Sequence, residues 1–380
     1  MEKKIPIRLY DEEGNEIVRE VSYRSVVDAH TGMTRWEMEP GQDLSGGKLQ
    51  VDPHLRIVSI GGGTGLPVLL RGLKHYLFTN SDKNMIEPSF RERLTAIVAM
   101  TDDGGSSGRL RHELNVLPPG DIRNCLIGLS ENESLMAKLL KFRFKGDNGL
   151  SGHSLGNLIL AALSEINQSF FKAVSDLSSI LAINGQILPA TLEKAVLRAE
   201  LADGSMIEGE TAINACPKPI RRIMIEPEGA RPLDQSIASL EKAHGIIIGP
   251  GSLYTSILPN LMIHGVADAI KRSPAGKILV ANLMTEPEET RGFTVEDHIR
   301  VIHEHAGFRL IDHVLINHAP LPLHLKSRYH GEGAEATRYD IEEIRRMGVH
   351  PVEADLLSSD DQKVRHDPEK LARNILKLLR

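Results

Sequence analysis

The sequence predicts an α/β protein, built on a parallel sheet with helices on both faces and carrying a small β-rich insertion. Two observations indicate this fold. Short apolar runs that end in glycine-rich turns alternate with stretches in which leucines recur at helical spacing, as in residues 56–60 and 66–77. Glycine accounts for 33 of 380 residues and aromatic residues for only 4%, which suits a fold with many tight strand-to-helix turns.

Charge and cysteine content exclude several classes of protein. The formal net charge is −6, from 45 basic and 51 acidic residues, so no nucleic-acid partner is expected. The two cysteines, Cys125 and Cys216, exclude a disulfide scaffold and a four-thiolate zinc site, and they fit a reducing compartment. No apolar run reaches about 18 residues, and residues 1–8 lack the apolar core of a signal peptide. We therefore expect a cytoplasmic protein with no membrane span.

The chain divides into three parts. Residues 1–53 are expected to be an N-terminal extension, either a β-hairpin turning at residues 13–15 and followed by a glycine-rich linker, or a weakly attached arm. Residues 54–330 form the main α/β domain, and short β-like runs at about 196–226 predict the insertion. Residues 331–380 complete the domain with a helical segment.

The remaining elements of the main domain follow in order. Buried strands are predicted at residues 94–100, 245–248, 277–281 and 313–317, and helices at residues 155–166 and 294–306. Thr294 is the expected N-cap of the last of these, with Asp297 three residues on in a capping-box arrangement. The final helix is expected to begin with Asp367 as its N-cap and Pro368 at its first position.

A glycine-rich turn, Gly61-Gly62-Gly63-Thr64-Gly65, separates the first buried strand from the first helix. Glycine permits positive φ angles and lets a ligand approach the backbone. The amide groups at the start of a helix point toward such a ligand, and the helix dipole favours an anion. Gly62, Gly63, Thr64 and Gly65 are therefore candidate phosphate-binding residues, although a tight turn without a ligand has the same pattern.

This turn does not match the common nucleotide-binding motifs. Leu66 stands at the third glycine position of the dinucleotide fingerprint, and no acidic residue ends a second strand about 20 residues downstream. The chain also lacks the Gly-Lys-Ser/Thr sequence of a P-loop. An NAD-dependent oxidoreductase and a P-loop hydrolase are therefore disfavoured, although such a crevice could still accept NAD.

A second polar loop, residues 101–109, follows the next predicted strand. Ligands of open parallel sheets bind outside the carboxyl ends of the strands. Asp102 and Asp103 are candidates to accept sugar hydroxyls or to hold Mg²⁺ bridged to phosphate, and Arg109 is a candidate to pair with phosphate. The backbone and hydroxyl groups of the same loop add four candidates, Gly104, Gly105, Ser106 and Ser107. The alternative is a polar surface loop.

Two further polar clusters open predicted helices. Asp121, Arg123 and Asn124 precede an apolar stretch, and Asp121 is either a ligand contact or only the cap of that helix. His153 and Asn157 begin another helix, and His153 is equally well explained as a loop histidine bonded to backbone. No serine has a base and an orienting acid beside it in the sequence, so a hydrolytic triad is not predicted.

The fourth candidate site follows the predicted strand at 245–248. It consists of a Gly-Pro-Gly turn and the start of the next helix, and its candidate residues are Gly249, Gly251, Ser252, Leu253 and Tyr254. Two anion-binding turns on neighbouring strands would suit a diphosphate-linked ligand. Tyr254 either stacks on a base or fills a gap in the core.

Together these motifs resemble the gluconeogenesis factor (YvcK-like) branch of the 2-phospho-L-lactate transferase (CofD-like) superfamily. The segments that carry the resemblance are residues 60–65, 101–109, 119–124, 152–157 and 249–260. The resemblance implies a three-layer, Rossmann-like fold that binds a nucleotide across the carboxyl ends of its strands. It makes residues 54–330 a nucleotide-binding domain.

The resemblance also implies a function. It implies a cytoplasmic regulatory protein that binds a UDP-sugar and is linked to gluconeogenic growth, cell shape and cell-wall synthesis. The expected partners are this ligand, a protein partner and further copies of the chain, and no resident metal is expected. The alternative is an Mg²⁺-dependent transferase acting on a nucleotide-diphosphate-linked donor, as in the transferase branch. Two loops, Asp-Asp-Gly-Gly-Ser-Ser-Gly and Pro-Gly-Ser-Leu-Tyr-Thr-Ser, depart from the transferase pattern and weaken that alternative.

Overall fold

The structure is a computed structural model that describes residues 2–10, 16–27, 34–38, 51–78, 88–130, 135–147, 149–359 and 362–379. The chain forms two compact units, Met1–Asp52 and Pro53–Arg380. None of the helices in the described ranges has the length and apolar character that crossing a membrane requires.

The first unit contains a three-stranded antiparallel sheet. Its strands are β1 (Glu2–Tyr10), β2 (Glu16–Val27) and β3 (Thr34–Met38), in the order β1-β2-β3. β1 pairs with β2 along the whole length of β1. The third strand, β3, pairs with the end of β2 and was not predicted from the sequence. The turn predicted at residues 13–15 and the glycine-rich linker lie outside the described residues.

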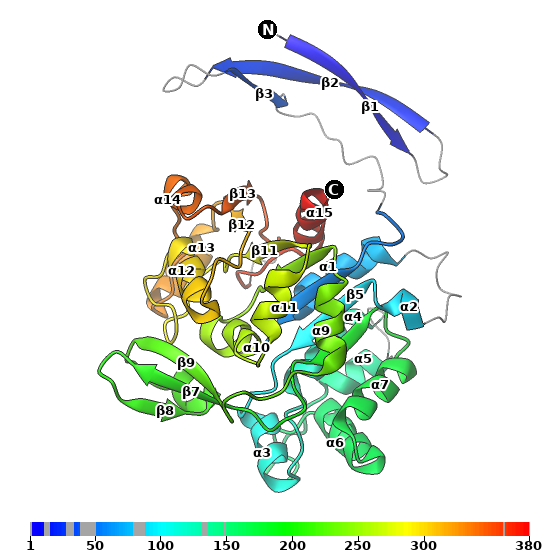
Figure 1. Cartoon of the computed structure of the whole chain (residues 1–380), viewed down its shortest axis with the longest axis vertical. Helices are drawn as coiled ribbons and strands as arrows, with labels where there is room; N and C mark the ends of the chain where they lie inside the picture. The colour runs from blue at the N-terminus through cyan, green and yellow to red at the C-terminus, as the bar shows by residue number, and fades with distance from the viewer. Residues whose placement is uncertain are drawn as a thin grey trace. The chain divides into compact units, whose positions relative to one another are not determined.

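The second unit is organised around a seven-stranded parallel sheet (Figure 1). Its strands are β4 (Ile57–Gly61), β5 (Leu94–Val98), β6 (Gln186–Pro189), β10 (Gly245–Ile248), β11 (Gly276–Val280), β12 (His313–Asn317) and β13 (His350–Ala354). Their order is β13-β12-β11-β10-β4-β5-β6. From β4 the strands are added toward one edge of the sheet, as far as β6. The chain then returns to place β10 on the other side of β4, and β11, β12 and β13 follow toward the opposite edge. The direction therefore changes between β4 and β10, which is where open α/β sheets bind their ligands.

Helices flank the sheet. Because crossovers between parallel strands are right-handed, the helices that follow β4 and those that follow β10 lie on opposite faces. One group that packs together is α1 (Leu66–Leu77), α4 (Gly120–Leu129) and α15 (Pro368–Leu378). The helices after the insertion include α9 (Asp234–Glu241), α11 (Val266–Arg272) and α12 (Val295–Ala306).

Further helices and a π-helical turn join these elements. They are α2 (Pro88–Arg91), α3 (Gly105–Glu113), α5 (Leu135–Lys141), α6 (Leu155–Asn167), α7 (Phe170–Ile180), η2 (Leu253–Ile257), α10 (Leu258–Leu261), α13 (Leu323–Gly331) and α14 (Ile341–Arg346). The predicted capping box of Thr294 and Asp297 forms at the start of α12. Asp367 caps α15, as predicted, by accepting hydrogen bonds from two backbone amides.

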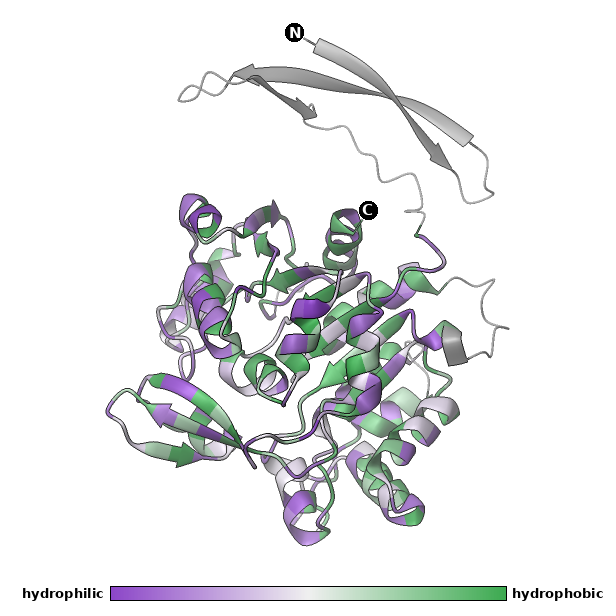
Figure 2. Cartoon of the chain, viewed as in Figure 1, coloured by the Kyte–Doolittle hydropathy of each residue, from purple (hydrophilic) through white to green (hydrophobic). Residues whose placement is uncertain are grey.

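The core lies in the sheet. Every residue of β4, β5 and β10 is buried, as expected of parallel strands that are covered on both faces. Figure 2 shows apolar residues concentrated in these central strands and polar residues on the outer helices. The sequence prediction of an α/β fold with a parallel sheet is confirmed.

The predicted β-rich insertion is also confirmed. β7 (Val196–Leu201) pairs with β8 (Met206–Glu208) and β9 (Ile220–Glu226) in an antiparallel sheet. A short helix, α8 (Glu210–Asn214), lies between β8 and β9. The insertion joins the main apolar core through buried side chains such as Ile213 and Ile223.

Two strands of the main sheet were not predicted. β6 holds only two buried aliphatic residues before Pro189, so its apolar run is too short to recognise. β13 is an edge strand, and most of its residues are partly exposed. The segment 331–380 is therefore not wholly helical, because it contributes the strand β13 to the sheet.

Candidate functional site

The two glycine-rich turns meet at the carboxyl edge of the sheet. Ile60 lies beside Ile248 in the register of β4 and β10, so the turns that follow leave the sheet side by side. A Cβ atom on Gly65 would lie 2.4 Å from the carbonyl oxygen of Pro250, so only glycine allows this approach. Gly63 has a φ of +61°, in the left-handed region that glycine readily adopts. The two turns therefore form one joined stretch of backbone.

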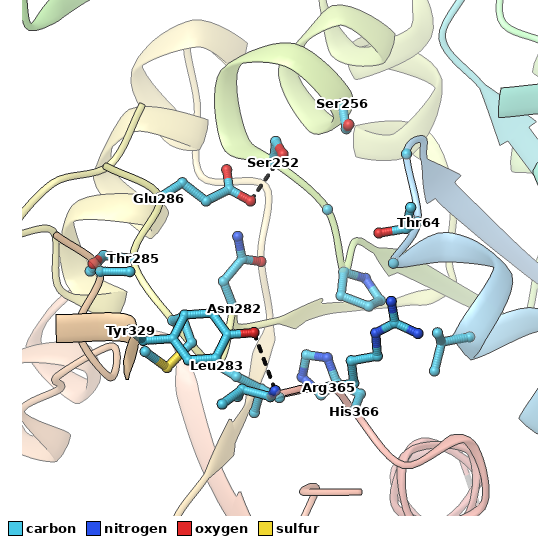
Figure 3. Close-up of a pocket in the computed structure, with 18 of the residues that line it drawn as sticks. Thr64, Ser252, Ser256, Asn282, Leu283, Thr285, Glu286, Tyr329, Arg365 and His366 are labelled. Atoms are coloured by element: carbon cyan, nitrogen blue, oxygen red, sulfur yellow. Dashed lines mark hydrogen bonds between the residues drawn. The ribbon is translucent and has the colours of Figure 1, made fainter. Parts of the chain in front are cut away.

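This joined backbone lines a cavity of about 640 Å³ (Figure 3). Five of the predicted residues line it: Gly63, Thr64, Gly65, Gly251 and Ser252. The other walls come from α1, the end of α5, the loop after β11, α13 and the segment before α15. They include residues that were not predicted, namely Arg71, Lys141, Asn282, Thr285, Glu286, Tyr329, Arg365 and His366. The volume falls within the range of small-molecule sites, about 300–1,000 Å³.

Arg365 and Glu286 lie on different sides of this cavity. Figure 3 shows Arg365 on the side of Thr64, and Glu286 together with Ser252 across from them. Arg71, from α1, adds a second guanidinium to the lining. An anion bound at the glycine turns would therefore have a cationic side chain close by.

Asp121 holds the first glycine turn. Its Oδ2 accepts a hydrogen bond from the Gly63 amide at 2.7 Å, and Asn124 donates to the Gly63 carbonyl at 3.3 Å. The Asp121 side chain makes no capping bond to α4, so the interpretation as a helix cap is wrong. Burial raises the pKa of Asp121 to about 6. Since Asp121 takes the Gly63 amide, phosphate contacts would fall to Thr64 and Gly65.

Carboxyl groups also hold the second turn. Ser252 donates its hydroxyl to Oε1 of Glu286 at 3.0 Å, and the Tyr254 amide donates to Oε2 of Glu289 at 2.8 Å. The Tyr254 ring is buried and packs edge-on against Phe293, so it fills the core and does not stack on a base. The side chain of Leu253 is likewise fully buried.

The acidic loop after β5 contacts the insertion rather than the cavity. Asp102 accepts a hydrogen bond from the amide of Gly104 at 2.9 Å, at the start of α3. Asp103 Oδ1 accepts from the amide and the hydroxyl of Thr211, in α8, at 2.8 and 2.7 Å. Within the described part of the chain, residues 102–109 do not line the cavity.

The residues present do not form a metal site of their own. Among the described residues, no group of three or more histidine, cysteine, aspartate or glutamate side chains is placed to hold a metal ion. Thr211 donates a hydrogen bond to Asp103. A metal ion bridged to a phosphate would therefore depend on Asp102 for a carboxylate ligand from this loop.

Five predicted residues form a buried polar network. Arg123 donates to Oδ1 of Asn157 at 3.0 Å, and Asn157 donates to the hydroxyl oxygens of Ser106 and Ser107 at 3.1 and 3.5 Å. Ser106 is also within 3.0 Å of Nδ1 of His153. Burial lowers the pKa of His153, which favours the neutral ring. These groups bind one another and join α3, α4 and α6 beneath the loops.

Ser106 and His153 form a pair of a serine and a base that the sequence did not indicate. Ser106 is 3% exposed, and it accepts hydrogen bonds from the protein, so it is not placed as a nucleophile. Arg109 also lies away from the cavity and donates to the carbonyl of Ser151 at 2.6 Å. Gly105 and Gly62 belong to the turns at α3 and α1 but are not part of the cavity lining.

Some lining residues could have been found from the sequence and others could not. Asn282, Thr285 and Glu286 follow a predicted strand, β11, so the rule for carboxyl ends of strands points to them. Tyr329 lies on α13, and Arg365 lies just before α15. No local motif marks these two residues, because only the packing of α13 and α15 brings them to the cavity.

Comparisons with known proteins place this geometry in a family. Residues 57–357 match the family described as 2-phospho-L-lactate transferase CofD. The chain is 43% identical to the gluconeogenesis factor of Bacillus subtilis, over 86% of this chain and 98% of that protein. It is 44% identical to the gluconeogenesis factor of Listeria monocytogenes, over 85% of this chain and 95% of that protein.

A solved structure agrees with these relatives. It is a crystal structure of a UPF0052 family member from Bacillus halodurans, with a TM-score of 0.79 and 40% identity. The similarity covers 85% of this chain and 99% of that chain. The chain therefore belongs to the CofD family, and within it to the group of proteins named gluconeogenesis factor.

Proposed function

We propose that this chain is a cytoplasmic regulatory protein that binds a UDP-sugar and acts in gluconeogenic growth, cell shape and cell-wall synthesis. One observation carries the ligand part of the proposal: two glycine turns join at the switch point of the sheet, beside a cavity of about 640 Å³. The name shared by the relatives, gluconeogenesis factor, supports the part that concerns gluconeogenic growth.

A diphosphate suits the chemistry of the joined turns. Thr64 and Gly65 immediately precede α1, and the N-terminus of a helix favours an anion. Arg365 lies on the same side of the cavity and supplies a guanidinium group, which pairs well with phosphate oxygens. Asn282 and Tyr329, in the other walls, add the amide and ring that sugars and bases commonly contact.

The lining favours binding over catalysis. In the part of the chain that the structure describes, no serine of the cavity is hydrogen-bonded to a histidine. The second candidate, an Mg²⁺-dependent transfer from a nucleotide-diphosphate donor, needs no covalent residue and depends on positioning and charge. It would rely on Asp102 and Asp103, and the bonds from Thr211 to Asp103 count against it.

Calorimetric titration with UDP-N-acetylglucosamine tests the binding role. We expect saturable binding by the wild type and binding weakened about tenfold or more by Arg365→Ala, because a charge-assisted hydrogen bond is lost. Arg346→Ala, on α14 and outside the cavity, is the matched control and should bind as the wild type does. No heat at millimolar ligand from a folded sample would contradict the proposal.

Donor consumption separates the two candidate functions. Long incubation with UDP-N-acetylglucosamine, Mg²⁺ and several acceptors should leave the donor intact if the chain only binds it. Metal-dependent loss of the donor that is abolished by Asp103→Asn would favour the transferase instead. NAD belongs in the same titrations as a competitor, since the crevice could accept it.

The expected homo-oligomer has a candidate contact surface on α6. Apolar residues hold most of its outward positions, namely Leu155, Leu158, Ile159, Ala162, Leu163 and Ile166, and Glu165 is the charged residue among them. Ile166 is 76% exposed. A largely apolar exposed face marks a candidate interaction surface, and such a face can pack against the same face of a second copy. We therefore propose that α6 pairs with α6 of another copy.

A further inference from the structure

Glu286 is a carboxyl group in the wall of the cavity, on the loop that follows β11. Its Oε1 accepts the hydroxyl of Ser252 at 3.0 Å. Its Oε2 has no hydrogen-bond partner among the described residues. The Oε2 atom is closed to solvent, so Oε1 is the oxygen that a ligand in the cavity can reach. A carboxyl oxygen offers about two acceptor positions, so Oε1 can accept a second hydrogen bond beside that of Ser252.

Backbone hydrogen bonds fix the position of Glu286. Its amide donates to the hydroxyl of Thr290 at 2.9 Å, and its carbonyl accepts from the amides of Glu289 and Thr290 at 3.1 and 2.7 Å. Through Ser252, the side chain is tied to the residue that follows the second glycine turn. The carboxyl group therefore has a fixed place beside the second glycine turn, across the cavity from Thr64.

Glu286 suits a donor group and not a phosphate. A carboxylate repels a phosphate but accepts hydrogen bonds from hydroxyl groups. Thr64, just before α1, and Arg365 lie across the cavity from Glu286 (Figure 3). The cavity is thus polarised, and it orients a ligand with its phosphates toward Thr64 and a hydroxyl-bearing part toward Glu286.

We propose that Glu286 is a specificity-determining residue that accepts hydrogen bonds from the hydroxyl groups of a sugar attached to the ligand's diphosphate. This inference rests on the proposed function and deepens it. Two sugars of a UDP-sugar present such hydroxyl groups: the ribose of the nucleotide and the second sugar beyond the diphosphate.

Titration of the full chain with UDP-N-acetylglucosamine and with UDP tests the proposal. Glu286→Gln keeps the size of the side chain but replaces one carboxyl oxygen with an amide group that donates hydrogen bonds. We expect Glu286→Gln to weaken binding of UDP-N-acetylglucosamine about tenfold or more. Glu228→Gln makes the same exchange at an exposed position that does not line the cavity and should change neither affinity.

The two ligands distinguish the two sugars. A loss confined to UDP-N-acetylglucosamine assigns Glu286 to the second sugar, and an equal loss for UDP assigns it to the ribose. Unchanged affinity for both ligands in a folded Glu286→Gln overturns the inference while the proposed function stands. Failure of the wild type to bind either ligand overturns both.

A second variant guards against misfolding of the first. Glu286→Asp retains the charge but draws the carboxyl group back by one methylene, so the same loss of affinity is expected. Thermal unfolding of each variant shows whether the protein is folded. A folded Glu286→Asp that binds both ligands as the wild type does would also overturn the inference.

Discussion

Replacing Gly65 with alanine tests whether contact between the two glycine turns forms the binding site. The backbone of Gly65 is in the right-handed helical region, with φ −76° and ψ −49°, so alanine is not strained there. Its Cβ atom, however, would lie 2.4 Å from the carbonyl oxygen of Pro250 and 2.8 Å from its carbonyl carbon. Ordinary contact begins near 3.4 Å, so the turns must separate by about 1 Å.

This separation should affect binding more than folding. Overpacking of this kind costs about 1–3 kcal/mol of stability, whereas a displacement of about 1 Å within a site can cost about 100-fold in function. Urea unfolding measures the first quantity, and calorimetric titration with UDP-N-acetylglucosamine measures the second. Gly149→Ala is the control, because a Cβ atom on Gly149 meets nothing within 4 Å. Binding by folded Gly65→Ala at wild-type affinity would refute the reasoning.

Three further predictions concern the insertion and the outer surface. Burial and the neighbouring Asp102 raise the pKa of Glu210 from 4.5 to about 9. Between these pH values the carboxyl group is protonated in the folded state and ionised in the unfolded state. The stability of the fold therefore falls as pH rises through this range. Glu210→Gln should therefore increase stability more at roughly pH 8 than at roughly pH 5, and an equal effect in urea unfolding at both would contradict this. Thr211→Ala removes the hydroxyl bond to Asp103 and should cost about 1 kcal/mol and speed hydrogen exchange in α8; unchanged exchange would count against it. Ile166→Asp should reduce the mass measured by sedimentation to that of one chain, and a wild type that already sediments as one chain would contradict the α6 contact.

Much of the fold could be predicted because the central strands are buried on both faces. The runs that form β4, β5 and β10 are mostly apolar and are followed by glycine-rich turns, and that pattern is visible in one sequence. The edge strand β13 could not be found, since one side of an edge strand faces water and its residues are mixed.

The sequence indicated the glycine turns of the candidate site, but it did not indicate most of the side chains that line the cavity. Glycines that permit a close approach, such as Gly65, leave a clear signal in the sequence. The sequence of a turn does not show which side chains accept hydrogen bonds from its amides. The hydrogen bond from the Gly63 amide to Asp121 was therefore not predicted. Arg365 was missed because it reaches the cavity only through the packing of α15 against α1.

The most direct test of the account is a structure of the chain with UDP-N-acetylglucosamine bound. We predict that the diphosphate oxygens lie within hydrogen-bond distance of the amides of Thr64, Gly65 or Gly251, in the cavity that these residues line. A diphosphate that lies against the loop at residues 102–109, out of reach of both glycine turns, would contradict it.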